Sequence, residues 1–199
     1  MGLTANGRTA DHDVDPMFLH RWSPRAFTGE PIPDEVLMSL FEAARWAPSA
    51  FNLQPWRFVW ARPDTADWDR LFETLIEYNQ AWVRRASALV FVISDCFRRK
   101  GGEPEPLYSH SFDAGAAWAC LALQAHQLGW AAHGMTGFDP AKAHEAMDVP
   151  EGEYRIEAAV AIGRAADKSV LPELYQGREA PSGRAPLAGM VFEGRFKPA

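Results

Sequence analysis

Hydrophobic residues recur along this chain in patterns that predict alternating helices and strands. After Pro33, apolar residues appear every three or four positions and predict a helix over 34–46. Residues 88–93 form a nearly unbroken apolar run, which is typical of a strand buried on both faces of a sheet. Residues 111–128 are apolar almost all round, so we expect a helix in the protein's centre or at a subunit interface.

Weaker patterns complete the order of elements. They predict a short helix from Met17 that ends before Pro24, strands over 56–60, 130–135 and 155–163, and helices over 66–78 and 140–146. Gly129 fits the end of the long helix. The alternation predicts an α+β or α/β sandwich.

The remaining segments carry little periodicity. We expect residues 1–16 to form a flexible arm and residues 98–108 an exposed loop, without deciding whether that loop covers a site as a lid. The tail after Gly163 keeps many apolar residues, and we expect it to wrap around a partner subunit, chiefly over 170–199. Residues 17–199 then form one domain, which a chain of 199 residues can fill with a single core.

Charge and composition exclude several classes of function. A net charge of −6 and a pI near 5.5 argue against sequence-independent binding of nucleic acid. No apolar run has the length of a membrane span or a signal peptide, so we expect no membrane partner. Cys96 and Cys120 lack CxxC spacing, which predicts no metal site and a reduced, cytoplasmic chain.

Two segments carry candidate chemistry. Arg21, Ser23 and Arg25 alternate in a short loop next to a proline, so their side chains can converge on one anion such as a phosphate; ordinary surface arginines are the alternative. The segment APSAFNLQPW over 47–56 joins a helix to a strand and presents side chains that can hydrogen-bond a flat polar ring. A turn that satisfies its own backbone is the alternative there.

Together these segments resemble a known family. The stretch RWSPRAFTGEPIPDEVLMSLFEAARWAPSAFNLQPWRFVWA over 21–61 is similar to the N-terminal signature of the FMN-binding nitroreductases. The similarity continues through Gly134-Met135-Thr136-Gly137-Phe138 and Pro181-Ser182-Gly183-Arg184. The resemblance implies an α+β, three-layer sandwich with a central, mainly antiparallel sheet, and a homodimer whose C-terminal arms are exchanged.

The resemblance also implies where FMN binds. It places the phosphate and ribityl chain against the residues of the first loop and of the C-terminal segment: Arg21, Trp22, Ser23, Arg25, Ser182 and Arg184. It places the flavin ring against Asn79 and the backbone of Gly134, Met135, Thr136 and Gly137. The partner subunit contributes the turn residues Pro48, Ser49, Ala50, Asn52 and Gln54, so the sites are composite.

Some positions depart from the family pattern. Trp82 stands where many members have a basic residue, Thr136 where some have an acidic one, and Ser182 where a lysine is frequent. We expect Trp82 and Phe51 to line the substrate pocket, because both adjoin proposed flavin contacts. His133 has the same neighbourhood, although a packed core histidine is the better interpretation.

The sequence contains no protease, hydrolase or P-loop signature, so the chemistry must come from a bound cofactor. The resemblance implies that NAD(P)H reduces bound FMN and that a small electron-poor acceptor of the nitroaromatic, quinone or enal type then takes the hydride in a ping-pong scheme. No protein residue is predicted to be catalytic. A family relative with dehalogenase, oxidase or flavin-fragmenting activity and a non-catalytic flavin-storage protein are the alternatives.

Overall fold

A four-stranded antiparallel sheet forms the middle of the molecule in the computed structural model, which describes residues 4–99 and 101–197. Its strand order is β3-β4-β8-β7, with β3 at Trp56–Ala61, β4 at Ala88–Asp95, β8 at Tyr154–Gly163 and β7 at Ala131–Met135. Every β4 residue is buried, because β4 lies inside the sheet and both of its faces are covered. The edge strand β7 is the one that borders the candidate site.

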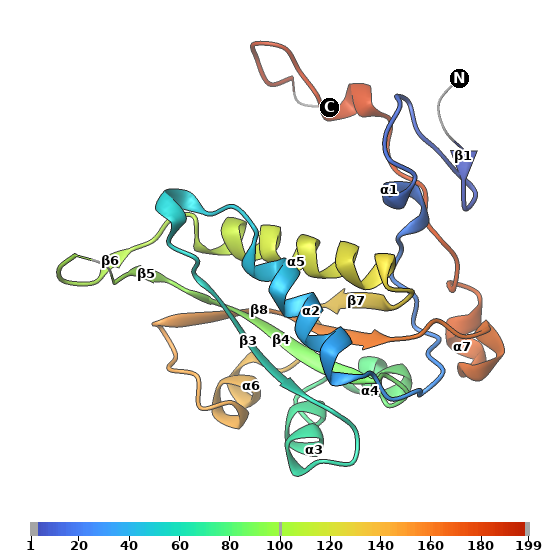
Figure 1. The fold of residues 1–199 in the computed structure, drawn as a ribbon, viewed down its shortest axis with the longest axis horizontal. Helices are drawn as coiled ribbons and strands as arrows, with labels where there is room; N and C mark the ends of the chain where they lie inside the picture. The colour runs from blue at the N-terminus through green and yellow to red at the C-terminus, as the bar shows by residue number, and fades with distance from the viewer. Residues whose placement is uncertain (1–3, 100, 198–199) are drawn as a thin grey trace.

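Helices cover both faces of the sheet and make three layers (Figure 1). One face carries α2 (Asp34–Arg45) and the long α5 (His110–Gln127), and the other carries α3 (Ala66–Phe72), α4 (Glu77–Val83) and α6 (Pro140–Ala146). Alternate residues of β4 divide between the two cores: Val90 and Val92 pack under α2 and α5, whereas Phe91 packs under α3, α4 and α6. The α+β three-layer sandwich predicted from the sequence is confirmed.

Local sequence signals explain where most elements begin and end. The predicted helices over 34–46, 111–128 and 140–146 are present within a residue of their expected bounds. Asp139 caps α6 by accepting a hydrogen bond from the Lys142 amide at 3.1 Å, with Pro140 in the first turn. Gly129 has a φ of +74°, the left-handed conformation that ends α5 and turns the chain into β7.

The predicted helix over 66–78 begins at Ala66 as expected but does not continue to residue 78, because the chain breaks between α3 and α4. Leu75 forms a β-bridge with Phe138, and the Ile76 amide donates to the Gly137 carbonyl at 3.1 Å. These bonds come from a segment about sixty residues away, so no local pattern could reveal them. The break places the start of α4 beside the end of β7.

Short elements occupy the parts predicted as arm and loop. Strands β1 (Thr4–Ala5) and β2 (Arg8–Thr9) form an N-terminal hairpin, and β5 (Phe97–Arg98) pairs with β6 (Glu105–Pro106) inside the predicted exposed loop. The others are helical: α1 (Met17–His20), η1 (Ala50–Asn52), η2 (Lys168–Val170), α7 (Glu173–Gln176) and η3 (Leu187–Gly189). The N-terminal hairpin and the C-terminal segment run together at one end of the molecule (Figure 1).

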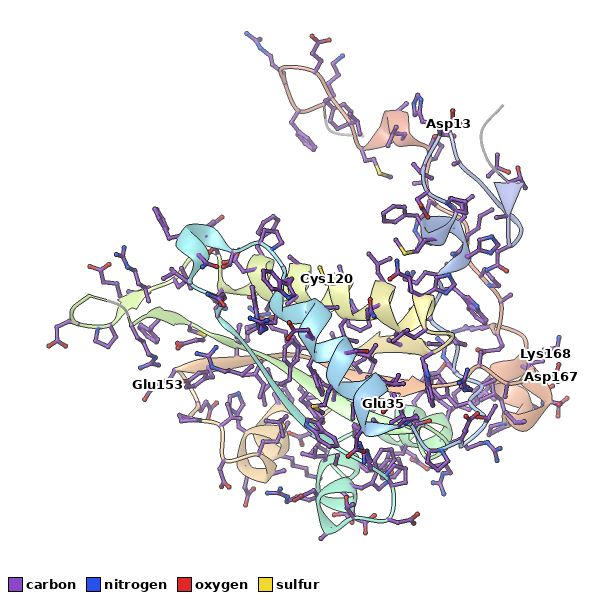
Figure 2. The ribbon with its side chains drawn as sticks, viewed as in Figure 1. Asp13, Glu35, Cys120, Glu153, Asp167 and Lys168 are labelled. Atoms are coloured by element: carbon purple, nitrogen blue, oxygen red, sulfur yellow. The ribbon has the colours of Figure 1, made fainter. Side chains whose placement is uncertain are left out.

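Side chains fill the space between the sheet and its helices, and charged residues such as Glu153, Asp167 and Lys168 lie on the outside (Figure 2). The C-terminal segment is an exception to this sorting, because Met190, Val191 and Phe196 are exposed although they are apolar. Among the described residues, no helix is both long enough and apolar enough to cross a membrane.

Candidate functional site

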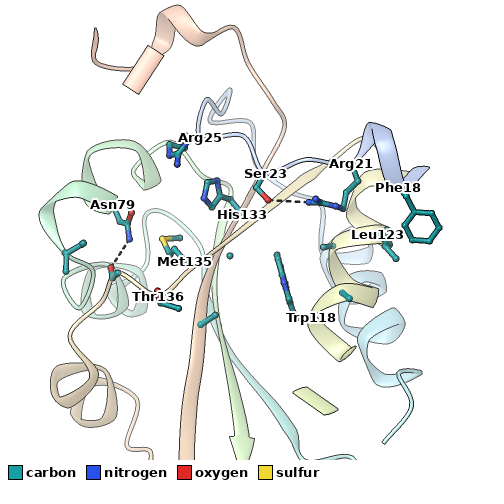
Figure 3. A pocket seen from close by; sticks show the side chains of 16 residues that line it. Phe18, Arg21, Ser23, Arg25, Asn79, Trp118, Leu123, His133, Met135 and Thr136 are labelled. Atoms are coloured by element: carbon teal, nitrogen blue, oxygen red, sulfur yellow. Dashed lines mark hydrogen bonds between the residues drawn. The ribbon is translucent and has the colours of Figure 1, made fainter. Parts of the chain in front are cut away.

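A cavity of about 760 Å³ lies along the edge strand β7 (Figure 3). Three parts of the chain build it: the loop after α1, the C-terminal half of α5, and the segment from β7 to Gly137 that meets the start of α4. Its lining includes Arg21, Ser23, Arg25, Asn79, Trp118, His133 and Gly134 to Gly137. The structure therefore brings together two of the three predicted groups of site residues.

A second cavity of about 310 Å³ adjoins the first and is strongly basic. Five arginines line it, namely Arg8, Arg21, Arg25, Arg178 and Arg184, together with Trp22 and Ser182. Within the described ranges, only Arg25 among these five has a carboxylate partner, Glu179, whose Oε2 lies 3.8 Å from Nη1. The remaining positive charge makes this cavity suited to a dianion.

The arginines perturb one another. Burial lowers the pKa of Arg21, and the charges of Arg8 and Arg184 lower it further. The Arg21 Nη1 atom lies 3.4 Å from the Ser23 hydroxyl oxygen, which is a weak interaction. The guanidinium groups thus repel each other, and apart from Arg25 none of those lining the cavity is neutralised by a carboxylate of the described residues. A bound phosphate would relieve that repulsion.

The wall of the main cavity formed by residues 134–137 requires glycine at two positions. A Cβ atom at Gly137 would lie 2.4 Å from Asn79 Nδ2 and 2.8 Å from Ile76 Cδ1, and one at Gly134 would lie 3.1 Å from a ring carbon of Trp118. The Asn79 amide donates from Nδ2 to the Gly137 carbonyl at 2.9 Å (Figure 3). This close packing leaves a flat wall beside β7, against which a planar ring can lie. Thr136 is exposed, whereas Met135 packs into the core.

His133 connects the two cavities, since it lines both. Its Nδ1 atom lies 3.0 Å from the Pro24 carbonyl, so Nδ1 carries the proton that it donates and Nε2 is left as an acceptor. Burial lowers the pKa of His133 to about 4, and the charge of Arg25 adds to that effect. The imidazole is therefore neutral near pH 7. Arginines donate only, so this wall of the cavity gains an acceptor through His133.

Trp82 does not line the substrate pocket as predicted. It is 1 % exposed and packs between Phe27 and His133, with ring centroids 6.2 Å and 4.7 Å away. Helix α4 buries Trp82 in the core and holds Asn79 beside the Gly137 carbonyl at the cavity, a difference that their closeness in sequence does not reveal. No face of the indole is open for a ligand to stack on.

The turn over 48–54 lies away from the cavity of its own chain. It sits at the N-terminal end of α5, where the Ala50 amide donates to Asp113 Oδ2 at 3.2 Å, whereas the cavity begins near Trp118. No residue of the turn lines either cavity. Three non-glycine residues of the turn have positive φ values between 51° and 55°: Phe51, Asn52 and Gln54. Such strain costs on the order of 1–3 kcal/mol per residue and is concentrated at functional sites.

Comparison with known proteins identifies the family. Residues 19–164 match the model of the nitroreductase family. The chain belongs to the nitroreductase family. This assignment agrees with the sequence resemblance over residues 21–61.

Individual relatives extend the comparison. The chain is 51% identical to a solved oxidoreductase containing FMN, with 99% of this chain and 100% of that chain covered and a TM-score of 0.95. It is 28% identical to a candidate nitroreductase from Desulfovibrio desulfuricans solved in complex with FMN, with 91% and 96% covered and a TM-score of 0.72. A protein named NADH dehydrogenase from Thermus thermophilus is 29% identical over 90% of this chain and 95% of its own length.

The family match does not cover the whole basic cavity. Arg8, Arg178, Ser182 and Arg184 of the basic cavity all lie outside residues 19–164. Sequence reasoning missed Arg8 and Arg178, because a lone arginine in a polar segment carries no signal. It also discounted His133, whose position next to Gly134 was the one available hint.

Proposed function

We propose that the protein is an FMN-dependent oxidoreductase that takes hydride from NAD(P)H and passes it to a small electron-poor acceptor of the nitroaromatic, quinone or enal type. The observation that carries the proposal is the pair of joined cavities. One holds several unneutralised arginines, and the other has a glycine wall that a planar ring can approach. A phosphate joined to a flat ring by a flexible polar chain has this shape and charge. The FMN found in the 51% identical relative has the same construction.

In the proposed site each group of residues has a separate task. Arg21, Ser23, Arg25 and Arg184 hold the phosphate, with Trp22 and Ser182 beside them. His133, which lines both cavities and keeps Nε2 as an acceptor, would hold the hydroxylated chain that joins the phosphate to the ring. Asn79 and the backbone of Gly134 to Gly137 orient the ring.

The turn residues Pro48, Ser49, Ala50, Asn52 and Gln54 reach the flavin of a partner subunit in this proposal. The supporting observation is their separation from the cavity of their own chain. Trp118, where the cavity begins, lies five residues beyond Asp113, and the arginine loop meets α5 near Ala122. At 1.5 Å per residue, the five residues from Asp113 to Trp118 separate the turn from the start of the cavity by about 7.5 Å along α5, and the nine residues to Ala122 separate it from the arginines by about 14 Å. A second copy of the chain, related by a two-fold axis, would bring the missing turn.

Exposed apolar side chains support the same dimer. Phe51, Tyr108 and Phe112 are exposed around the turn and the start of α5. Met190, Val191 and Phe196 are exposed on the C-terminal segment, and we propose that this end of the predicted arm over 170–199 embraces the partner. Its first part packs against its own subunit, where Leu171 and Tyr175 are buried and Arg184 lines the basic cavity. A monomer rarely leaves so many large apolar groups in water, so a partner surface accounts for them.

When bound, FMN supplies the hydride-accepting centre, flavin N5. The protein's own residues bind the phosphate, orient the ring and leave one open space for donor and acceptor, which therefore use it in turn. No carboxylate, thiol, amine or phenol of the described residues lines the main cavity, and a pKa lowered to about 4 leaves His133 a weak base, so we assign no protein acid or base. Phe51 of the partner is the aromatic that we place beside the acceptor. The two free cysteines and the need for NAD(P)H favour the cytoplasm.

A flavin-storage role loses its main support from the structure. That alternative required Trp82 to cover the open face of the ring, and Trp82 is buried in the core. The main cavity stays open instead.

An anaerobic absorbance spectrum tests the proposal. The purified protein is expected to carry FMN, identified by mass after release, and its visible band should bleach with NADH or NADPH. Arg21→Ala and Arg184→Ala should each weaken FMN retention, whereas Arg70→Ala, whose side chain pairs with Asp67 on α3, should not. Protein that binds no added FMN would refute the assignment, and flavin that stays oxidised would refute the reductase activity.

Mixed dimers test the composite site. Arg184→Ala and Asn52→Ala are each expected to be inactive alone, because each lacks one half of every site. Subunit exchange between them should restore activity, since one site of each mixed dimer then has both native residues. If the turn served its own chain, no mixed dimer would contain an intact site and activity would stay absent.

A further inference from the structure

Arg8 lies in a hairpin within residues 1–16, the segment that the sequence predicts to be a flexible arm. Strands β1 and β2 pair Thr4 with Thr9 and Ala5 with Arg8. The turn between them is Asn6-Gly7, with φ values of 56° and 71°, the sequence and geometry favoured in tight hairpins. Asn6 also donates from Nδ2 to the His20 carbonyl at 3.2 Å. The hairpin is therefore attached to the end of α1, where the arginine loop begins.

The Arg8 guanidinium joins three separate segments of backbone. Its Nη1 donates to the Leu19 carbonyl at 2.9 Å and to the Arg21 carbonyl at 2.8 Å, and its Nε donates to the Ser182 carbonyl at 2.8 Å. These carbonyls lie 11, 13 and 174 residues from Arg8. Arg8 thus fixes the loop that carries Arg21 against the segment that carries Arg184.

The charge of Arg8 is not neutralised by the protein. Within residues 4–99 and 101–197, no carboxylate forms an ion pair with it. Burial lowers the pKa of Arg8, and the charge of Arg184 lowers it further. A third cation beside Arg21 and Arg184 adds repulsion that the backbone carbonyls do not neutralise. The arrangement becomes favourable when an anion occupies the cavity, because the anion then neutralises all three charges.

We propose that the N-terminal hairpin is part of the cofactor site and that Arg8 is a positioning residue for the FMN phosphate, holding Arg21 and Arg184 in register and adding its own charge to the cavity. This inference rests on the proposed function, because it assumes that FMN is the anion. Arg8 lies outside the segment matched by the family model, so the hairpin extends the site beyond that segment.

Paired titrations with FMN and riboflavin test the proposal. Riboflavin has the same ring and ribityl chain but no phosphate, so the ratio of the two dissociation constants isolates the phosphate contribution. Apoprotein is titrated with each flavin, with quenching of flavin fluorescence as the signal. Arg8→Met should weaken FMN binding roughly tenfold or more, as expected for losing a hydrogen-bonded charge, and should leave riboflavin binding unchanged. Arg8→Lys should recover part of the loss.

Arg85→Met is the matched control. Arg85 also donates to backbone carbonyls of a distant segment, those of Phe27 at 3.0 Å and Thr28 at 3.1 Å, yet it lines neither cavity. Its loss should leave the ratio of FMN to riboflavin affinity unchanged. In the native protein the ratio of FMN to riboflavin affinity should fall as salt rises, because salt screens the attraction between the arginines and the phosphate. It should fall less steeply in Arg8→Met, which has one charge fewer.

The outcomes separate the inference from the function that it assumes. If native protein binds FMN but Arg8→Met keeps the native ratio, or loses both flavins equally, the role of Arg8 in phosphate binding is refuted and the proposed function stands. If native protein binds neither flavin, both are refuted. If Arg8→Met does not fold, Arg8→Lys is the deciding variant, because lysine keeps the charge but cannot donate to all three carbonyls in the same geometry. A native ratio of FMN to riboflavin affinity and a native salt dependence in Arg8→Lys would contradict the positioning role.

Discussion

The half-buried imidazole of His133 should make the stability of the apoprotein depend on pH in a defined window. Burial lowers its pKa from 6.5 to about 4, and the charges of Arg25 and Arg21 contribute in the same direction. Above pH 6.5 the ring is neutral in both the folded and the unfolded chain, so it contributes no pH dependence. Between pH 6.5 and 4 the unfolded chain binds a proton that the folded chain does not, and stability falls as pH falls.

The size of this effect follows from the two pKa values. One pKa unit corresponds to about 1.36 kcal/mol, so lowering the pKa of His133 to about 4 removes about 3 kcal/mol of stability by the lower end of the window. Below pH 4 the folded protein also binds the proton, and the loss levels off. Small proteins are stable by roughly 5–15 kcal/mol in total, so this single group is a large fraction.

The assay compares native apoprotein with His133→Asn in urea at several pH values from 7.5 to 4. Asparagine can still donate to the Pro24 carbonyl but does not titrate, and the carboxylates common to both proteins cancel in the difference. The native protein should be the more stable at pH 7.5, and its advantage should shrink by about 3 kcal/mol toward pH 4. His144→Asn, which removes another imidazole bonded to a backbone carbonyl, serves as the comparison. A difference that stays constant over the whole range would refute the assignment of a neutral His133.

Three further substitutions test the packing of the site. Gly137→Ala should destabilise the protein by about 1–3 kcal/mol and lower flavin affinity, because its Cβ would lie 2.4 Å from Asn79 Nδ2; urea unfolding and a flavin titration measure both, and native values would contradict the glycine wall. Asp113→Ala should release the strained turn by removing the acceptor for the Ala50 amide, costing about 1–3 kcal/mol and reducing turnover; unchanged turnover would show that the turn has no part in catalysis. Phe51→Ala should raise KM for aromatic acceptors without changing stability or flavin retention, since the ring is 88 % exposed; an unchanged KM would remove Phe51 from the acceptor pocket.

The parts of the fold that sequence patterns predicted are those whose stability is local or whose burial is complete. Helix α2 has one apolar face, β4 is apolar throughout, and α6 has a capping aspartate followed by proline. The break between α3 and α4 escaped prediction because its causes, the bridge to Phe138 and the bond to the Gly137 carbonyl, come from a distant segment. The N-terminal hairpin had a local signal in Asn6-Gly7, but strands of two residues are held mainly by contacts outside the hairpin.

The residues of the candidate site likewise differ in whether local sequence or distant contacts determine their positions. Arg21, Ser23 and Arg25 could be predicted to act together because two-residue spacing in a loop constrains their directions. Arg8 could not, since its place depends on carbonyls up to 174 residues away. Trp82 shows the opposite error: closeness in sequence to Asn79 suggested a shared pocket, yet Trp82 is buried in the core whereas Asn79 lines the cavity.

The strained turn before β3 links these observations to the dimer. A chain that holds Phe51, Asn52 and Gln54 at positive φ would gain stability by relaxing, unless the turn is needed in that shape. Inside its own subunit the shape serves no cavity, and the bonds to Asp113 and Ser49 merely hold it in place. We therefore infer that the turn keeps its strained shape because it presents its surface to another molecule. The exposed aromatic side chains beside it suit a protein partner, and the symmetric solution is a second copy whose cavity lacks this same turn.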